Sequence, residues 1–231
     1  MILKTDRYEG RRQAQSLVLK LLRENNDVNS AEAFNKYLLS SSRSCLSSLL
    51  NLFKQSQSLF YTSRDVDKKI SLEATNLLWL LDVLRDRRAA EEFALMWANQ
   101  QKLANLHVKS KTPDRDLISL ITIRLLVGIG NGEILPAKKT KQLLLLTWFR
   151  PLLDDYSSLR QYRSIDPKEA EENIERAILE LIPEDQLSIL FTWYECFLKK
   201  GDSYPDLRKA FEGWCRGSFG KRPTLSLSRN K

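Results

Sequence analysis

The sequence predicts an all-α protein of about nine or ten amphipathic helices, arranged as a helical bundle or an irregular α-solenoid-like array. The 231-residue chain holds only 8 glycines and 7 prolines, so few tight turns and long elements are expected. Apolar residues recur at intervals of three and four over most of the chain, which is the period that places them on one face of a helix. Capping residues mark where several of these helices begin and end.

The first predicted helices lie between residues 31 and 97. Ser30 is a suitable cap for a helix over 31–39. Three apolar stripes follow along this part of the chain, and each can be buried only against a neighbouring helix. The stripes consist of Leu46, Leu49, Leu50 and Phe53; of Ala74, Leu77, Leu78, Leu81 and Leu84; and of Ala90, Phe93, Ala94 and Trp97.

The segment 113–127 has features of both a helix and a strand. Its residues 117–127 (LISLITIRLLV) include several β-branched side chains, which suit a strand. Thr112 and Pro113 form a helix-start signal, the apolar run is long, and no partner strand is predicted. We therefore predict a helix that ends at Gly128, because glycine tolerates the left-handed backbone that closes a helix.

Further helices are predicted in the C-terminal half. Asp166 and Pro167 are typical of a helix start, since the carboxylate can accept from a backbone N–H and proline suits the first helical position. Gly201 is expected to end a later helix. The apolar stripes are Leu145, Trp148, Phe149 and Leu152; Ile174, Ala177, Ile178, Leu181 and Ile182; Leu187, Leu190, Phe191, Tyr194 and Leu198; and Leu207, Ala210, Phe211 and Trp214.

Polar and turn-forming stretches predict where the helices are interrupted. The longest loops are expected at 57–69, 131–138 and 157–166. A soft boundary near 128–138 separates two groups of helices without making two independent domains. The predicted organisation is a basic N-terminal lead at 1–15, an all-helical interaction domain at 16–215 and a basic disordered tail at 216–231.

The net charge of +8 is concentrated at the two ends of the chain. Residues 1–25 hold six basic and three acidic residues, and residues 216–231 hold five basic residues and no acid. The remaining 26 basic and 26 acidic residues leave the body of the protein neutral. The positive charge that would attract nucleic acid is therefore not a property of the predicted helical domain.

Cysteine usage indicates a reducing compartment, and hydropathy gives no sign of a signal peptide or a membrane span. Cys45, Cys196 and Cys215 are scattered, odd in number and too few for a disulfide framework. The first residues lack the apolar core of a signal peptide, and no stretch approaches the roughly 18–20 uncharged apolar residues of a membrane span. The expected location is the cytoplasm or the nucleus, and no membrane partner is expected.

No residue pattern predicts a catalytic, cofactor-binding or metal site. Gly128, Gly130 and Gly132 lack the spacing of a phosphate-binding loop and instead suit the end of a helix. His107 is the only histidine, which excludes a multi-histidine metal site. The three cysteines lie in predicted helices without metal-ligand spacing, as structural thiols do.

Neighbouring acids and tryptophans are interpreted as structural. Adjacent carboxylates on a helix point in different directions and usually contact solvent. The five tryptophans lie in apolar stripes and are expected to anchor the core first and an interface second. The acid pairs expected on the surface are Glu91 and Glu92, Asp154 and Asp155, and Glu171 and Glu172.

The C-terminal tail provides the only candidate contact residues. From residue 217 onwards the helical period is lost, and the tail carries positive charge without acids. Such a tail can contact a protein partner or a nuclear-import receptor. The candidate contacts are Lys221, Arg222 and Arg229.

The order of segments along most of the chain resembles the helical C-terminal half of plant BTB/POZ domain-containing proteins. The resemblance implies a BACK-like helical fold and a place in an adaptor for a cullin-based ubiquitin ligase, with the helical half holding the target. The segments that carry it are VLKLLRENND at 18–27, CLSSLLNLF at 45–53, residues 72–107, residues 121–156 and residues 179–219.

One departure from the family pattern changes what the resemblance implies. No mixed α/β segment typical of a BTB fold precedes the helices, so the chain is expected to be a short or fragmentary product or a member without the cullin-binding half. Cullin binding and dimerisation through a BTB fold are accordingly not expected of this chain. The family offers no catalytic residues or cofactor to carry over.

Two functions from different classes follow. The first is a non-enzymatic protein-interaction module, the substrate-side region of a BTB/POZ adaptor, whose partners are proteins that become ubiquitination targets. The alternative is a nuclear or nucleic-acid-associated protein that acts through its basic ends, which would bind nucleic acid with a steep salt dependence. The neutral body of the chain favours the first.

Overall fold

The computed structural model describes residues 16, 20, 28–58, 64–110 and 115–219. Over these residues the secondary structure consists of nine α-helices and one 3-10 turn, with no strand. The all-α prediction is therefore confirmed for the described part of the chain. The elements are α2 (Val28–Ser58), α3 (Arg64–Asp86), α4 (Glu91–Ala98), α5 (Gln101–Lys109), α6 (Asp116–Gly130), α7 (Lys138–Leu159), α8 (Pro167–Leu179), α9 (Pro183–Lys200), η2 (Gly201–Ser203) and α10 (Arg208–Phe219).

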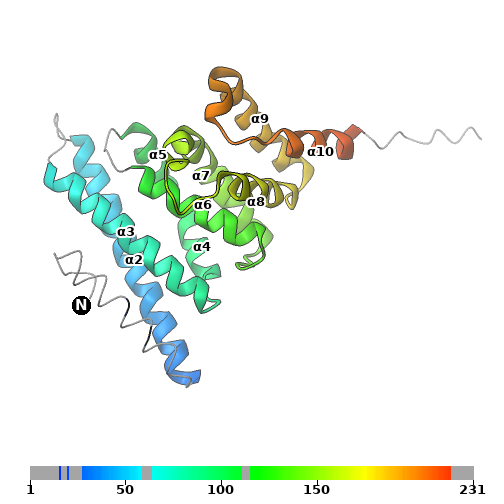
Figure 1. The fold of residues 1–231 in the computed structure, drawn as a ribbon. Helices are drawn as coiled ribbons and strands as arrows, with labels where there is room; N and C mark the ends of the chain where they lie inside the picture. Colours follow the sequence, from blue (N-terminus) through cyan, green and yellow to red (C-terminus); the bar gives the residue numbers. More distant parts are fainter. Residues whose placement is uncertain (1–15, 17–19, 21–27, 59–63, 111–114, 220–231) are drawn as a thin grey trace, which may run out of the picture.

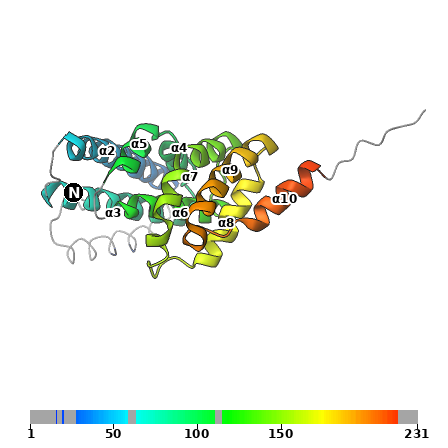
Figure 2. The same cartoon turned by 90° about the horizontal axis from the view of Figure 1, so that it is seen from above.

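The helices form an irregular array that progresses from one end of the molecule to the other. Figures 1 and 2 show the long pair α2 and α3 at one end, α4 to α7 in the middle, and α9 and α10 at the opposite end. Arg87, just after α3, donates to Asn35 Oδ1 and to the carbonyl oxygen of Ala31 near the start of α2. The two long helices are therefore antiparallel.

A single hydrophobic core extends from Leu38 on α2 to Ala210 on α10. Its centre holds the indole rings of Trp97 and Trp148, which stack with 4.4 Å between ring centroids. Trp148 Nε1 donates to the carbonyl oxygen of Trp97, and Trp97 Nε1 donates to Thr122 Oγ1. Because each indole N–H has a partner, both rings can be buried without an unpaired donor. The prediction that these tryptophans anchor the core is confirmed.

Helix α2 is longer than the sequence pattern indicated. The expected break after residue 39 is absent, and a single helix of 31 residues runs to Ser58. Ser42 turns inward and its hydroxyl donates to the carbonyl oxygen of Leu38, which satisfies a polar side chain within a buried face. The loop expected at 57–69 is also wrong over 57–58 and 64–69, because α2 runs to Ser58 and α3 begins at Arg64. Residues 59–63 lie outside the described part of the chain.

Helix α6 confirms the helical interpretation of 117–127 but does not end at Gly128. The helix continues to Gly130, and Thr112 and Pro113 lie outside the described residues. Gly130 is packed so closely against α8 that a Cβ built on it would lie 2.5 Å from the carbonyl oxygen of Asn173. The close approach of α6 and α8 thus requires a glycine at this position, whereas Gly132, in the turn that follows, has a positive φ of 80°.

The predicted signals at both ends of the C-terminal helices are confirmed. Asp166 Oδ1 accepts from the backbone N–H of Lys168, and Pro167 occupies the first position of α8. Gly201 ends α9 with a φ of 54°. Helix α10 continues to Phe219, so residues 216–219, predicted as the start of a disordered tail, are helical.

Helix α9 turns a different face to the core from the one predicted. Of the expected stripe, Leu190 is buried, whereas Leu187, Phe191, Tyr194 and Leu198 are exposed. The buried face instead contains Ile189, Trp193 and Cys196. Ile182, expected to continue the buried stripe of α8, is exposed as well. The cause is that α9 carries apolar residues around most of its circumference, so its period does not select one face.

Candidate interaction surfaces and a buried polar cluster

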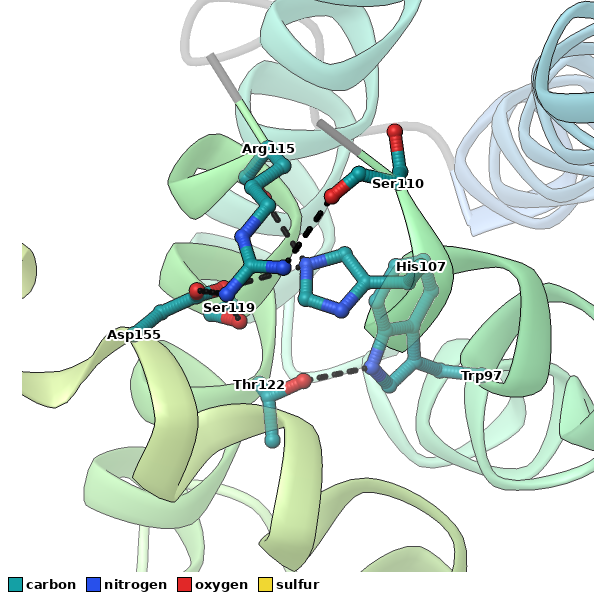
Figure 3. A network of polar contacts seen from close by, with 7 residues as sticks. All are labelled: Trp97, His107, Ser110, Arg115, Ser119, Thr122 and Asp155. Carbon is teal, nitrogen blue, oxygen red and sulfur yellow. Dashed lines mark hydrogen bonds and ion pairs between the residues drawn. The ribbon is translucent and has the colours of Figure 1, made fainter. Parts of the chain in front are cut away.

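A buried polar cluster joins α5, α6 and α7 (Figure 3). Asp155 on α7 accepts a hydrogen bond of 2.7 Å from Ser119 Oγ on α6 and forms an ion pair of 2.6 Å with Arg115. His107 Nε2 on α5 lies 3.1 Å from Asp155 Oδ2 and 3.1 Å from the backbone oxygen of Arg115. Both neighbours are acceptors, so Nε2 carries the hydrogen. Arg115 also donates to the carbonyl oxygen of Ser110.

The electrostatic balance of the cluster favours an ionised Asp155. Burial by itself raises the pKa of this carboxyl, because a charge is costly in a medium of low dielectric constant. The hydrogen bonds from His107 and Ser119 and the positive charge of Arg115 outweigh burial and hold the pKa of Asp155 below its ordinary value. The expectation that Asp155 contacts solvent is therefore wrong, because three partners compensate its burial.

The residue types of this cluster resemble those of a serine hydrolase, but their arrangement differs. In such a triad, histidine lies between serine and the carboxylate and removes the serine proton. Here Ser119 and His107 both bind the same oxygen of Asp155, so histidine is not placed as a base for Ser119. All three side chains are buried. The cluster therefore connects three helices in the core.

The cysteines differ in their accessibility. Cys45 and Cys196 are buried, whereas Cys215 on α10 is partly exposed. Burial also raises the pKa of the Cys196 thiol, which lowers the fraction of reactive thiolate.

We expect iodoacetamide to label Cys215 at least about 10-fold faster than Cys45 or Cys196 in the native protein. Peptide mass spectrometry after timed labelling measures the three rates separately. Labelling in denaturant serves as the control, because all three thiols should then react at similar rates. A native rate for Cys196 equal to that of Cys215 would contradict the packing of α9.

A polar groove of about 550 Å³ lies between α3, α6 and the start of α8. Its lining holds five acidic and two basic residues, in a protein whose net charge is +8. Arg124 forms an ion pair of 2.6 Å with Asp82, and Arg85 lies 3.4 Å from Glu133. The three remaining carboxylates belong to Asp86, Asp166 and Glu169.

A second groove, of about 520 Å³, runs between α2 and α4 and is mainly apolar. Leu46 and Leu50 of α2 face Leu95 and Met96 of α4 across it. An ion pair between Arg43 and Glu92 closes part of its rim.

The exposed apolar side chains of α9 form a third surface. We define the α9 stripe as Leu187, Phe191, Tyr194 and Leu198. The ring of Tyr194 stacks on that of Phe211 from α10, with 5.8 Å between centroids. Trp214 Nε1 of α10 donates to the carbonyl oxygen of Pro183, which holds the two helices together.

The candidate contacts Lys221, Arg222 and Arg229 lie outside the described residues and stay predictions. Among the residues that the structure does describe, no group of three or more histidine, cysteine, aspartate or glutamate side chains is placed to bind a metal ion. Within the same residues, no helix combines the length and the apolar character needed to cross a membrane.

The comparisons with known proteins all lead to one family. The family model described as BTB/POZ Ankyrin-like repeat matches residues 2–221. The BTB/POZ domain-containing protein At3g50780 of Arabidopsis thaliana is 50% identical over 220 residues, which are 95% of this chain and 42% of that protein. At5g60050, also named a BTB/POZ domain-containing protein, is 36% identical over 94% of this chain and 44% of its own length.

A third Arabidopsis protein with the same descriptive name, At2g13690, is 28% identical over 90% of this chain and 39% of its own length. The chain thus spans less than half the length of the relatives it matches. No solved structure matches it.

Proposed function

The chain belongs to the BTB/POZ Ankyrin-like repeat family, and we propose that it is a non-enzymatic protein-interaction module, the substrate-side helical region of an adaptor for a cullin-based ubiquitin-protein ligase. Family membership and the rigid helical array support the interaction role. In this proposal cullin binding belongs to a BTB fold, and the helices hold the target protein in the cytoplasm or nucleus.

The polar groove between α3, α6 and α8 is the proposed target site, and its charge is the observation that carries this choice. Its lining has a local excess of three negative charges, whereas the helical body is neutral overall. Carboxylates on three different segments can surround an extended segment rich in lysine or arginine, because opposite charges attract over several ångströms and select the partner. The target class is therefore a protein with a basic recognition segment.

Reversing the charge of the groove is expected to remove the target and leave the fold intact. Asp86 and Glu169 are exposed, so the double variant D86K/E169K should lower target recovery at least about 10-fold by opposing a basic segment. The measurement is affinity purification from plant tissue with quantitative mass spectrometry. D65K/E212K is the matched control, since Asp65 and Glu212 are exposed acids outside the groove.

Three outcomes bear on the groove. Proteins retained by the original chain and by D65K/E212K, but lost from D86K/E169K, would support it. An identical set of proteins for all three chains, or no enriched protein at all, would refute it. Unfolding of D86K/E169K is detected by circular dichroism, and the single variant D86K then repeats the comparison.

The ligase role has its own test. A recovered target should be ubiquitinated in a reconstituted cullin reaction when this chain is fused behind a BTB domain, and much less with the D86K/E169K form of the fusion. If the target binds but receives no ubiquitin from the fusion, the interaction module stands and the adaptor role fails.

A further inference from the structure

Helix α9, which lies towards one end of the helical array (Figure 1), exposes a continuous apolar stripe. The four side chains of the α9 stripe, in chain order, are 41%, 55%, 40% and 67% exposed. Exposed single leucines are common on protein surfaces, but four aligned residues of which two are aromatic are not. The stripe is separate from the polar groove, whose lining includes no residue of α9.

The spacing of the stripe is that of a coiled-coil seam. From Leu187 the residues follow at intervals of four, three and four, which keeps them within a narrow arc of the helix. In heptad notation Leu187 and Tyr194 occupy d positions, and Phe191 and Leu198 occupy a positions. The core residues Ile189, Trp193 and Cys196 then occupy f, c and f, on the opposite side. Helix α9 therefore has one face for the core and a second face suited to another helix.

The order of intervals reads the same in both directions, so the stripe can face a copy of itself in an antiparallel pair. We propose that the α9 stripe pairs antiparallel with the α9 stripe of a second copy of this chain. A two-fold axis between residues 192 and 193 places Leu187 opposite Leu198 of the other copy, and Phe191 opposite its Tyr194. Such an isologous contact is closed and self-complementary, as two-fold interfaces are.

The charges around the stripe fit the same arrangement. The first turn of α9 carries Glu184 and Asp185, and its last turn carries Lys199. An antiparallel pair brings the acidic start of one helix near the basic end of the other and sets the two helix dipoles side by side in opposite directions, which is favourable. Glu195, at an e position, lies opposite Ser188 of the second copy, so no like charges meet beside the seam. A parallel pair would instead juxtapose the two acidic starts.

The size of the contact predicts a concentration-dependent dimer. An 18-residue helix is about 27 Å long, and one helix from each copy, widened by Phe211 of α10, forms an interface at the small end of the specific range. Self-association should therefore appear at micromolar concentrations, and the monomer should dominate at nanomolar ones.

Sedimentation velocity of the complete chain tests the pairing. At tens of micromolar the mass should rise from 26.8 kDa towards twice that value. F191E and L198E should each shift the dissociation constant upward at least about 10-fold, because a charge then has to be buried in the seam. L146E is the matched control: Leu146 on α7 is 50% exposed and lies outside the stripe, so this variant should dimerise like the original chain.

A charge-swap pair tests the antiparallel register. L187K and L198E should each dimerise at least about 10-fold more weakly than the original chain, whereas L187K/L198E should regain dimerisation, because the introduced lysine of one copy then lies opposite the introduced glutamate of the other at both ends of the seam. Circular dichroism confirms that each variant is folded. A chain that stays monomeric at all concentrations, or dimers that survive F191E, would overturn the proposal. A monomer that captures an amphipathic helix of another protein through the stripe would overturn it too.

The outcome is independent of the target groove. The groove variant D86K/E169K should remain dimeric, since both substituted residues lie outside α9. Loss of dimerisation in the stripe variants with unchanged target recovery would leave the proposed function in place.

Discussion

Replacing Asp155 by alanine is expected to destabilise the protein by about 3–5 kcal/mol. Asp155 receives a hydrogen bond from Ser119, contacts His107 Nε2 and pairs with Arg115, and only a small fraction of its surface is exposed. Its removal leaves His107 Nε2 with only the backbone oxygen of Arg115 nearby and a partly buried guanidinium without its counter-charge, which costs more than the lost contacts alone. Urea denaturation followed by tryptophan fluorescence measures the change.

A milder variant compares the loss of Asp155 itself with the loss of one of its hydrogen bonds. S119A removes one hydrogen bond to Asp155 and should cost about 1 kcal/mol. If D155A is no more destabilising than S119A, the carboxylate does not hold the three helices together.

The effect of D155A should depend on pH in a defined direction. The pKa of Asp155 is lower in the folded protein than in the unfolded chain. Its contribution is therefore fully present above the unfolded value of about 4 and is lost as pH falls through the folded pKa. The difference in unfolding free energy between the original chain and D155A should be constant near neutral pH and should shrink below about pH 4. A difference that grows on acidification would contradict the lowered pKa.

Replacing Gly130 by alanine is expected to cost about 2–3 kcal/mol, although alanine is the better helix former. A Cβ at this position would lie 2.5 Å from the backbone oxygen and 2.7 Å from the Cα of Asn173. Backbone atoms of α8 cannot rotate away as a flexible side chain does, so the two helices must separate. The midpoint and slope of urea denaturation report the loss.

Gly213 provides the control of opposite sign. It lies inside α10, and the nearest atom to a built Cβ is Leu179 Cδ2 at 3.8 Å, an ordinary contact distance. G213A should therefore stabilise the protein by about 0.5–1 kcal/mol through helix propensity. Stabilisation by both G130A and G213A would contradict the close packing of α6 on α8.

Most of the helical architecture could be predicted from local signals. The stripe from Ala74 to Leu84 is buried as expected, because α3 is polar on its other side and only one face can enter the core. Asp166 and Gly201 mark helix ends by chemistry that involves only their immediate neighbours. The break expected after residue 39 failed because serine favours turns on average, whereas Ser42 is satisfied within α2.

The buried polar cluster could not be predicted in the same way. Asp154 and Asp155 are adjacent and chemically identical, yet only Asp155 is buried. The difference depends on Arg115 and Ser119, which lie in a distant part of the chain and reach Asp155 only after α6 packs on α7. A composition or spacing rule has no access to such a partner.

The sequence by itself determined that the protein is helical, where the basic charge lies and which family it resembles, since these depend on composition, short periods and the order of segments. Only the tertiary structure decided which glycine allows α6 to approach α8, which acid is buried and which face of α9 remains exposed. The physical reason is that burial is a property of pairs of surfaces. Leu190 and Phe191 are neighbours of similar hydrophobicity, and the packing of α9 on α7 and α10 buries the first and leaves the second accessible to a partner.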